Sequence, residues 1–359
     1  MVPPMGLRDL LALRSLQHDG VPLTLEAALA AEGSPFQRSL LSLLVLDGRS
    51  VSTYVVREGG PDGAAGFVQA RQRPGRPEAD LLYIAPFPCS ERAVPIWERL
   101  LLSLSQWAVS NGIVRLYATI QADGPEEGCL RRAGFLRYAS DSVYRMEPLP
   151  ASFAPRFCPD LRPQMARDAW ALQRLYAGIT PLRVQQAEGL IHAGWSVPTA
   201  EWSGRSWTRS YVLEGRDGLE AYLGIRRGSK GHWFRLVMRP EASERRRELL
   251  AHALAVIAQW PPRPVYTCVR QYQNGQADDL ASLGFVFAGE RALTVRHLAQ
   301  HIRPALEEIV YRLQGAVSAN INTSIPDNGH AADGLVPIMG LPGIEAAASR
   351  PDVTDRVRA

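Results

Sequence analysis

The sequence contains almost no lysine. Of its 40 basic residues only Lys230 is a lysine, and the other 39 are arginines spread along the whole chain. With 36 Asp and Glu residues the formal net charge is only +4. A nucleic-acid-binding surface needs basic side chains gathered in a patch or stripe. The even spread therefore predicts no nucleic-acid partner.

Long hydrophobic runs are also lacking. Leu40–Leu46 is interrupted by Ser42 and falls far short of the roughly 20 residues that span a bilayer. Pro3, Pro4 and Arg8 precede any apolar run, which is not the order of a secretory signal. We therefore expect a cytoplasmic protein with no membrane partner, and its 46% hydrophobic residues suffice for a sizeable core.

Paired cysteines and several catalytic motifs are absent. The four cysteines, at 89, 129, 158 and 268, form no C-x-x-C pair, so neither a zinc knuckle nor a redox motif is predicted. The sequence has no Gly-x-Ser-x-Gly and no Walker loop. His297 and His301 are spaced i, i+4, as on one face of a helix, but have no glutamate between them and no evident third ligand. We expect no metal site.

An internal repeat is the most informative feature of the sequence. Leu82–Pro86 is echoed 154 residues later by Leu236–Pro240, and Gln106-Trp107 is echoed 153 residues later by Gln259-Trp260. The pair Gly134-Phe135 corresponds to Gly284-Phe285. One unit of about 150 residues thus occurs twice.

The period of hydrophobicity changes in the same order in both units. The first unit predicts strands at 51–57, 65–71, 80–86 and 114–120, a helix around 96–107, a short helix ending at Gly134 and two last strands within 135–146. The second predicts strands at 210–214, 220–226, 233–238 and 265–269, helices at 244–259 and from Ala277, and strands to Val295. Helical stretches at 7–17 and 164–177 precede the two sheets.

These patterns divide the chain into five parts. We expect one domain over 1–147, a proline-rich linker over 148–163 and a second domain over 164–303. A terminal helix over 304–314 and a disordered tail over 315–359 are expected to follow.

The order of elements resembles the GNAT N-acetyltransferase superfamily, and each unit looks like one GNAT domain. The resemblance covers about 7–298 and is similar to the tandem arrangement of mycothiol-synthase-like members. It implies an α/β (α+β) fold of two tandem GNAT-like domains, each a mixed, mostly antiparallel sheet flanked by helices. It also implies acetyl-CoA as co-substrate.

In that family the loop between the proline-ended strand and the long helix cradles the pyrophosphate of acetyl-CoA, because backbone N–H groups at a helix N-terminus favour an anion. Here both loops, 87–95 and 241–247, lack the glycines of the family pattern. Ser90 and Ser243 remain as candidate N-caps, and the nearby arginines as candidate phosphate ligands. The cofactor-binding residues that the resemblance implies are Ile84, Ala85, Ser90, Arg92, Val237, Met238, Ser243, Arg245, Arg246 and Asn274. A helix N-cap or turn role for Asn274 is an equal alternative.

The catalytic groups also depart from the family pattern. Its usual general acid, a tyrosine four residues before the glycine of the closing Gly-Phe, is replaced by Leu130 and Leu280. Candidate general bases are Glu78 and Asp80 in the first unit and His232 in the second. The alternative is that Glu78 and Asp80 are solvated turn residues and His232 lies at a strand edge.

Aromatic residues at 195, 202 and 207 precede the second sheet and predict either an aromatic-lined acceptor pocket or a packing lid. The leading function is an acetyl-CoA-dependent N-acetyltransferase acting on an unknown primary amine, either a small molecule or a peptide N-terminus. The alternative is a catalytically degenerate tandem GNAT protein that binds acyl-CoA or a protein partner. A third possibility, aminoacyl transfer from tRNA, would need a basic groove. The sequence leaves open whether the chain forms a homodimer. If only one unit is active, the second is favoured.

Overall fold

The computed structural model describes residues 9–24, 34–37, 39, 51–57, 64–73, 75–189, 207–273 and 275–298. All of them belong to one compact unit, Met1–His301. The predicted terminal helix over 304–314 and the tail over 315–359 lie outside the described residues. The predicted domain boundaries stay predictions.

The first half of this unit contains helices and strands in the predicted order. They are α1 (Asp9–Leu16), β1 (Val21–Pro22), β2 (Ser52–Arg57), β3 (Ala64–Gln72), β4 (Glu78–Ala85), α4 (Ala93–Ser110), β5 (Arg115–Gln121), α5 (Pro125–Arg132) and β6 (Leu136–Met146). The predicted strand and helix positions agree with these bounds to within a few residues.

The second half repeats the pattern. Its elements are β7 (Leu161–Pro163), the 3-10 helix η1 (Ala166–Asp168), α6 (Ala169–Ile179), α7 (Leu182–Ala187), β8 (Trp207–Gly215), β9 (Gly218–Arg227), β10 (His232–Met238), the 3-10 helix η2 (Pro240–Arg245), α8 (Arg246–Ile257), β11 (Val265–Arg270), α9 (Gln276–Ser282) and β12 (Val286–His297). Helix α7 and the short strands β1 and β7 were not predicted.

The repeated Gly-Phe pairs end α5 and α9 in the same way. Gly134 has φ 83° and Gly284 has φ 91°, a left-handed conformation that glycine adopts without a steric penalty. The N–H of Phe135 donates to the carbonyl of Leu130 at 3.0 Å, and Phe285 donates to Leu280 in the same way. This is a Schellman ending, with its characteristic apolar contact. The two leucines are therefore buried core residues.

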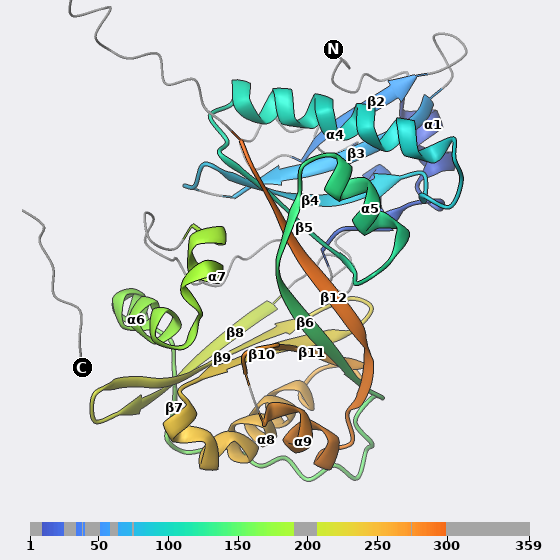
Figure 1. Ribbon diagram of the computed structural model, residues 1–359. Coiled ribbons are helices and arrows are strands. Elements are labelled where there is room, and N and C mark those ends of the chain that lie inside the picture. The colour runs from blue at the N-terminus through green and yellow to red at the C-terminus, as the bar shows by residue number, and fades with distance from the viewer. Residues whose placement is uncertain are drawn as a thin grey trace, which may run out of the picture. The chain divides into compact units, whose positions relative to one another are not determined.

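The two halves share one sheet because they exchange their last strands. The strand order is β2-β3-β4-β5-β12-β6-β11-β10-β9-β8-β7, with β1 attached to β4. Strand β6 of the first half pairs with β11, and β12 of the second half pairs with β5. Figure 1 shows β6 and β12 as two long strands running side by side between the halves.

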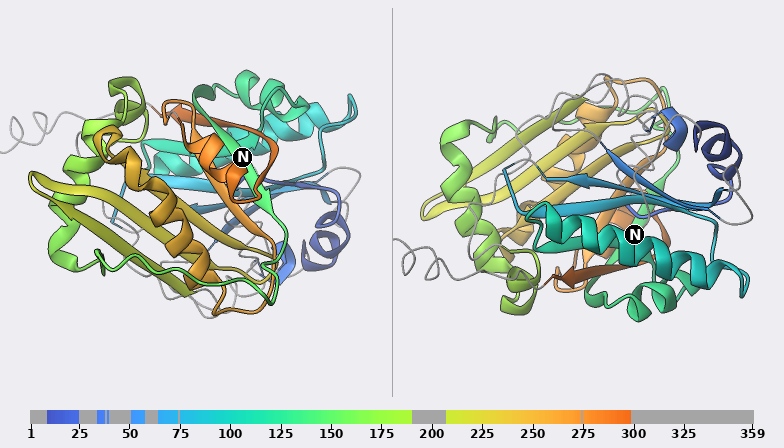
Figure 2. Two further views of the ribbon diagram at one scale, coloured as in Figure 1. Left: turned by 90° about the horizontal axis from the view of Figure 1, so that it is seen from below. Right: turned by 90° about the horizontal axis from the view of Figure 1, so that it is seen from above.

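Helices cover both faces of the sheet. Figure 2 shows α8 lying across the strands of the second half in one view and α4 lying across β2–β4 in the other. Helix α4, with the short α5 beside it, covers the large apolar core of the first half, and α8, with α9, covers that of the second. On the opposite face α1 packs on the first half, and α6 packs on β8, β9 and β10. The predicted mixed, mostly antiparallel architecture flanked by helices is confirmed.

Two details of the prediction are wrong. Residues 136–146 and 286–297 each form one long strand rather than two, because each strand crosses from its own half into the other. His297 is the last residue of strand β12. It is therefore not in a helix, as the i, i+4 spacing of His297 and His301 had suggested. His301 lies outside the described residues.

Each half contains one parallel strand pair that diverges. Strands β4 and β5 pair only from Glu78↔Arg115 to Asp80↔Tyr117. Strands β10 and β11 pair only from His232↔Val265 to Phe234↔Thr267. Beyond these short pairings β4 and β10 continue without their parallel neighbour, which leaves one opening in each half.

The chain itself fills the opening of the first half. Val21 pairs with Ile84, and the N–H of Leu23 donates to the carbonyl of Leu82 at 3.0 Å. On the other side Thr119 of β5 donates to the carbonyl of Leu23 at 2.8 Å. Val21 and Leu23 are buried. The segment 19–24 therefore bridges β4 and β5 as an inserted strand.

The segment 19–24 lies so close to β4 that a methyl group added at Gly20 should destabilise the fold. A Cβ there would lie 2.4 Å from the Tyr83 ring and 2.6 Å from the Ile84 carbonyl oxygen. We expect Gly20→Ala to lower the free energy of unfolding by about 1–3 kcal/mol, measured in guanidinium chloride. The control Gly178→Ala, in α6 with nothing within 4 Å of its Cβ, should raise it by about 0.5–1 kcal/mol. Equal stability of Gly20→Ala and wild type would contradict the insertion.

Candidate functional site

The opening of the second half presents an unpaired strand edge. The N–H of His232 donates to Pro264 on the β11 side, and backbone groups alternate in direction along a strand. The N–H and C=O groups of Leu236 and Met238 therefore face the opening, since residues 233, 235 and 237 point theirs toward β9. Among the described residues, no strand pairs with this edge of β10.

Charged side chains surround the same opening on the face that carries α6 and α7. Val237 packs against α6, so Arg235, two residues earlier on β10, points to the same side. Val265 and Val269 of β11 pack in the α8 core, so Arg270 points away from α8. Arg235 follows the last residue of β10 that pairs with β11, and Arg270 ends β11. The two guanidinium groups thus come from the two diverging strands.

Glu188, directly after α7, is the centre of this cluster. Its Oε1 lies 3.0 Å from Nη2 of Arg270 and accepts a hydrogen bond from the Tyr138 hydroxyl at 3.3 Å. Its Oε2 accepts a hydrogen bond from the Tyr176 hydroxyl. Nε of Arg270 lies 2.9 Å from the Asp141 carboxylate. We call Asp141, Glu188, Arg235 and Arg270 the central charge cluster.

Two nitrogens of the central charge cluster have no partner. Nη2 of Arg235 and Nη1 of Arg270 are buried and make no hydrogen bond. Arg270 is only 7% exposed. The guanidinium carbon of Arg235 lies 6.0 Å from the centre of the Tyr176 ring, and within the described residues it makes no ion pair. A buried N–H without a partner costs about 1–3 kcal/mol, more when it is charged, so the cluster is suited to take up an acceptor group.

Burial and charge shift the pKa values of the acidic groups in opposite directions. Burial tends to raise the pKa of Glu188, but Arg270 and the Tyr176 hydroxyl outweigh it, so that pKa lies below the usual value. Burial raises the pKa of Asp141, and Arg270 offsets this only in part. Burial and the nearby Glu188 raise the pKa of the Tyr138 and Tyr176 hydroxyls. Both phenols are therefore neutral donors.

The predicted bases Glu78 and Asp80 lie at the start of β4, held by arginines. Glu78 is 1% exposed, and its carboxylate lies 3.1 Å from Arg73, 3.4 Å from Arg76 and 3.4 Å from Arg115. Asp80 lies 2.7 Å from Arg73. Glu78 is thus buried and ion-paired rather than solvated, and both carboxylates lie where β4 and β5 are still paired.

His232, the third predicted base, is fully buried at the paired start of β10. Its Nε2 lies 2.8 Å from the carbonyl oxygen of Pro261, and its ring lies 5.3 Å from that of Trp260. Burial lowers the pKa of His232. The ring is therefore neutral, with Nε2 donating, and it is an interior residue rather than a strand-edge one.

The predicted phosphate ligands lie at the starts of α4 and α8. The serines do not cap these helices: the N-cap residues are Arg92 and Arg245, without a side-chain cap, because a turn and η2 separate Ser90 and Ser243 from the first helical residues. Arg245 lies 2.7 Å from Asp160 and 2.9 Å from Glu248. Arg246 lies 3.0 Å from Asp279 at the start of α9. Both arginines of the second half are therefore ion-paired.

The predicted backbone ligands differ between the halves. Ile84 pairs with Val21, and Ala85 is buried beside α1, so the first half offers no unpaired edge there. Met238 faces the second opening, whereas Val237 points its backbone groups toward β9. Asn274, Trp195 and Trp202 lie outside the described residues, and Trp207 begins β8.

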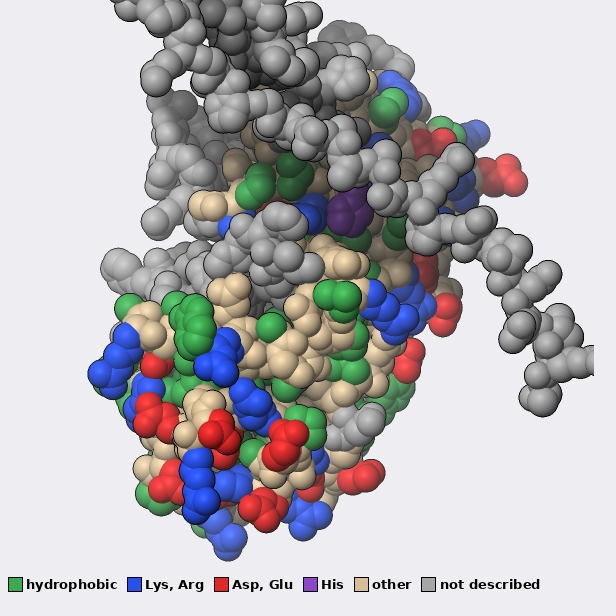
Figure 3. Space-filling view, turned by 60° about the vertical axis from the view of Figure 1, so that its left-hand side comes forward, with side chains coloured by type: hydrophobic (Ala, Val, Ile, Leu, Met, Phe, Trp, Pro, Cys, Tyr) green, Lys and Arg blue, Asp and Glu red, His purple; other side chains and the backbone are tan. Residues whose placement is uncertain are grey.

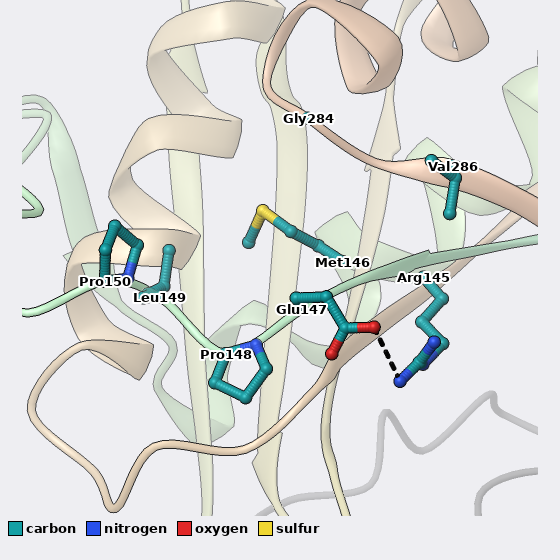
Figure 4. A pocket seen from close by; sticks show the side chains of 8 residues that line it. All are labelled: Arg145, Met146, Glu147, Pro148, Leu149, Pro150, Gly284 and Val286. Atoms are coloured by element: carbon teal, nitrogen blue, oxygen red, sulfur yellow. Dashed lines mark ion pairs between the residues drawn. The ribbon is translucent and has the colours of Figure 1, made fainter.

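Two hollows are lined by described residues. One, of about 240 Å³, lies where β6 passes into the linker, beside Gly284 and Val286. Figure 4 shows that its two charged side chains, Arg145 and Glu147, pair with each other at 2.9 Å. The second, of about 490 Å³, is lined by α7, Tyr138 and the end of β12. None of the four residues of the central charge cluster lines this hollow, although the hydroxyl of Tyr138, one of its lining residues, binds Glu188.

Three further features concern surface charge, helix length and candidate metal ligands. On the face shown in Figure 3 the coloured basic and acidic side chains are interspersed rather than gathered by sign. No helix in the described part of the chain is long and apolar enough to cross a membrane. Within the same residues no group of three or more His, Cys, Asp or Glu side chains is placed to hold a metal.

Sequence reasoning missed the central charge cluster. One signal was available: Arg235 interrupts the otherwise apolar run Trp233–Met238 of a strand that the repeat identifies as central. The other residues of the central charge cluster come from β6, β11 and the end of α7, which are distant in sequence. Their meeting could not be read from spacing.

Comparisons with known proteins gave structural matches only. No family model matches the sequence, and no curated protein matches it. A GCN5-related N-acetyltransferase from Sphaerobacter thermophilus is 13% identical over 79% of this chain and 96% of its own, with a TM-score of 0.48. A tandem GNAT protein from the clavulanic acid biosynthesis pathway is 16% identical over 78% of this chain and 98% of its own, with a TM-score of 0.45. A GCN5-related N-acetyltransferase from Anabaena variabilis is 13% identical over 82% of this chain and 71% of its own, with a TM-score of 0.38.

The buried histidines predict an acid-sensitive fold. Burial lowers the pKa of His232 and of His252, whose Nδ1 accepts the Cys158 N–H at 3.1 Å. Because the unfolded chain binds these protons first, the free energy of unfolding should fall as pH drops from about 7.5 to 5.5, by up to about 1.4 kcal/mol per pH unit for each histidine.

Denaturant titrations across this range test the effect. His232→Gln and His252→Gln should each flatten the pH dependence, whatever their effect on stability at pH 7.5. The exposed His18, changed to Gln, serves as control. A slope unchanged in both buried variants would show that these histidines do not cause the acid sensitivity.

Proposed function

We propose that the chain is an acyl-CoA-dependent N-acetyltransferase of the tandem GNAT type whose second half carries the active site. The supporting observation is the contrast between the two openings. The edge of β4 is already paired with the chain's own segment 19–24, whereas the edge of β10 at Leu236 and Met238 has no strand partner among the described residues. The first half then serves as a structural partner.

The opening of the second half suits the pantetheine arm of a CoA thioester. That arm is an extended chain with two amide groups, and an unpaired strand edge binds such a chain through its backbone N–H and C=O groups. In the first half Val21–Leu23 makes this kind of contact with β4. The same geometry in the second half would place the thioester beside the central charge cluster.

The transfer itself needs little covalent chemistry from the protein. The amine nitrogen bonds to the acyl carbon, the C–S bond breaks, one amine proton passes to a base, and the CoA thiolate takes up a proton. Asp141, with its pKa raised by burial, is the proposed base in place of Glu78, Asp80 and His232. Tyr138 and Tyr176 are neutral hydroxyl donors that bind Glu188 in the same cluster. Orienting the two reactants supplies much of the rate.

One observation favours the second candidate, a binding module without turnover. The segment before α8 is a 3-10 helix without glycine, and Arg245 and Arg246 are already paired with carboxylates. These arginines would have to exchange partners to bind the pyrophosphate. Binding of acetyl-CoA without acyl transfer would identify this alternative.

Calorimetric titration with acetyl-CoA tests the proposal. We expect wild type to bind with a Kd on the order of micromolar, and Met238→Pro to bind at least about tenfold more weakly, because proline removes the N–H that faces the opening. The control Met238→Leu keeps that N–H and a similar volume. Arg92→Ala in the first half should bind as wild type does.

Release of free CoA thiol in the presence of primary amines then measures turnover. Thiol release that depends on an amine supports the transferase. Binding without thiol release for every amine would favour the binding module, and no binding at millimolar acetyl-CoA would overturn both.

A further inference from the structure

The central charge cluster contains both signs of charge around the second opening. Asp141 and Glu188 are carboxylates, and Arg235 and Arg270 each carry one buried nitrogen without a partner. Arg270 is shared between both carboxylates. Arg235 forms no ion pair within the described residues; burial and Arg270 lower its pKa, but Tyr176, Glu188 and Asp141 together outweigh them and raise it. The unmet hydrogen-bonding capacity is therefore that of two guanidinium donors and of one acceptor, the buried Oδ1 of Asp141, which lies near Arg270 but accepts no hydrogen bond.

The chemistry of these unpaired guanidinium donors indicates which group of a ligand would bind them. A guanidinium prefers a planar acceptor with two oxygens, and a carboxylate is the common one. A simple amine would leave both buried nitrogens unsatisfied. The first half gives the contrast: the residue that follows the parallel pairing of β4 is the buried Leu81, whereas in β10 the residue at that position is Arg235.

Acidic groups beside the guanidinium groups specify the rest of the ligand. Asp141 and Glu188 lie next to Arg270, at 2.9 Å and 3.0 Å, and can accept hydrogen bonds from an ammonium group. A ligand with an ammonium and a carboxylate a few bonds apart would meet both kinds of side chain.

We propose that the acceptor of the second half is an amino acid, bound through its carboxylate by Arg235 and Arg270 and through its ammonium group by Asp141 and Glu188. This inference rests on the proposed function, since it names the class of amine. It makes Arg235 the residue that separates amino acids from simple amines. Such discrimination is expected to be large, because a simple amine leaves buried charged donors unpaired.

Binding of the acceptor without acyl-CoA tests the proposal separately from catalysis. The purified full-length protein is titrated calorimetrically with matched pairs: L-lysine and cadaverine, L-phenylalanine and 2-phenylethylamine, L-leucine and 3-methylbutylamine. At least one amino acid should bind about 10- to 100-fold more tightly than its amine. Arg235→Leu should reduce this ratio to about one, and Arg235→Lys should leave it in between.

The control is Arg209→Leu, which removes an exposed arginine of β8 that pairs with Gln259. It should keep the ratio of wild type, and thermal unfolding of each variant checks that the fold is intact. Equal binding of every amino acid and its amine, or a ratio that survives Arg235→Leu in a folded protein, would overturn the proposal.

Acetyl-CoA is titrated into the same wild-type preparation to separate the two proposals. Amino-acid binding without acetyl-CoA binding would refute the transferase and keep the amino-acid site. Acetyl-CoA binding without any preference for amino acids would refute only the acceptor class.

Discussion

The antiparallel pairing of β6 with β12 is the constraint on which the rest of the structure depends. These two strands are the last of their halves, and each has its other neighbour in the opposite half. Their backbone hydrogen bonds can therefore form only when both halves are folded. Because the two cores are joined through this pairing, neither half presents a free sheet edge at its centre.

The exchange also brings α7 of the second half onto the first. Tyr117 of β5 donates to the carbonyl of Ala187 at 2.9 Å, and Arg76 donates to the carbonyl of Glu188 at 3.3 Å. Gly189 has φ 69°, and a Cβ there would lie 2.5 Å from the Glu78 carboxylate. The carboxylate of Glu78 is thus part of the contact between the halves. The three arginines around Glu78 have a structural role, because a buried carboxylate needs partners of opposite charge.

Two copies of one fold have diverged at the same place, the point where two parallel strands separate. In the first half an inserted strand supplies the missing hydrogen bonds and Leu23 fills the space between β4 and β5. In the second half the strands carry arginines, whose burial is costly unless they are paired. The first copy gains stability from a filled opening. In the second copy, two buried guanidinium nitrogens of these arginines have no hydrogen-bond partner.

The sequence by itself determined the twofold repeat, the order of helices and strands in each copy, and the Gly-Phe endings of α5 and α9. These features depend on local periodicity and on glycine conformation, which neighbouring residues specify. Only the tertiary structure decided that the halves exchange strands, that residues 19–24 fill one opening, and that Glu188 meets Arg270, Tyr138 and Tyr176. These contacts join residues from 12 positions apart, as in Tyr176 and Glu188, to about 180 positions apart, as in Arg115 and His297. No local pattern encodes such a pairing. From the sequence, Glu78 and His232 are residue types that can act as a base. Only the structure shows that each is buried and bound to other parts of the chain.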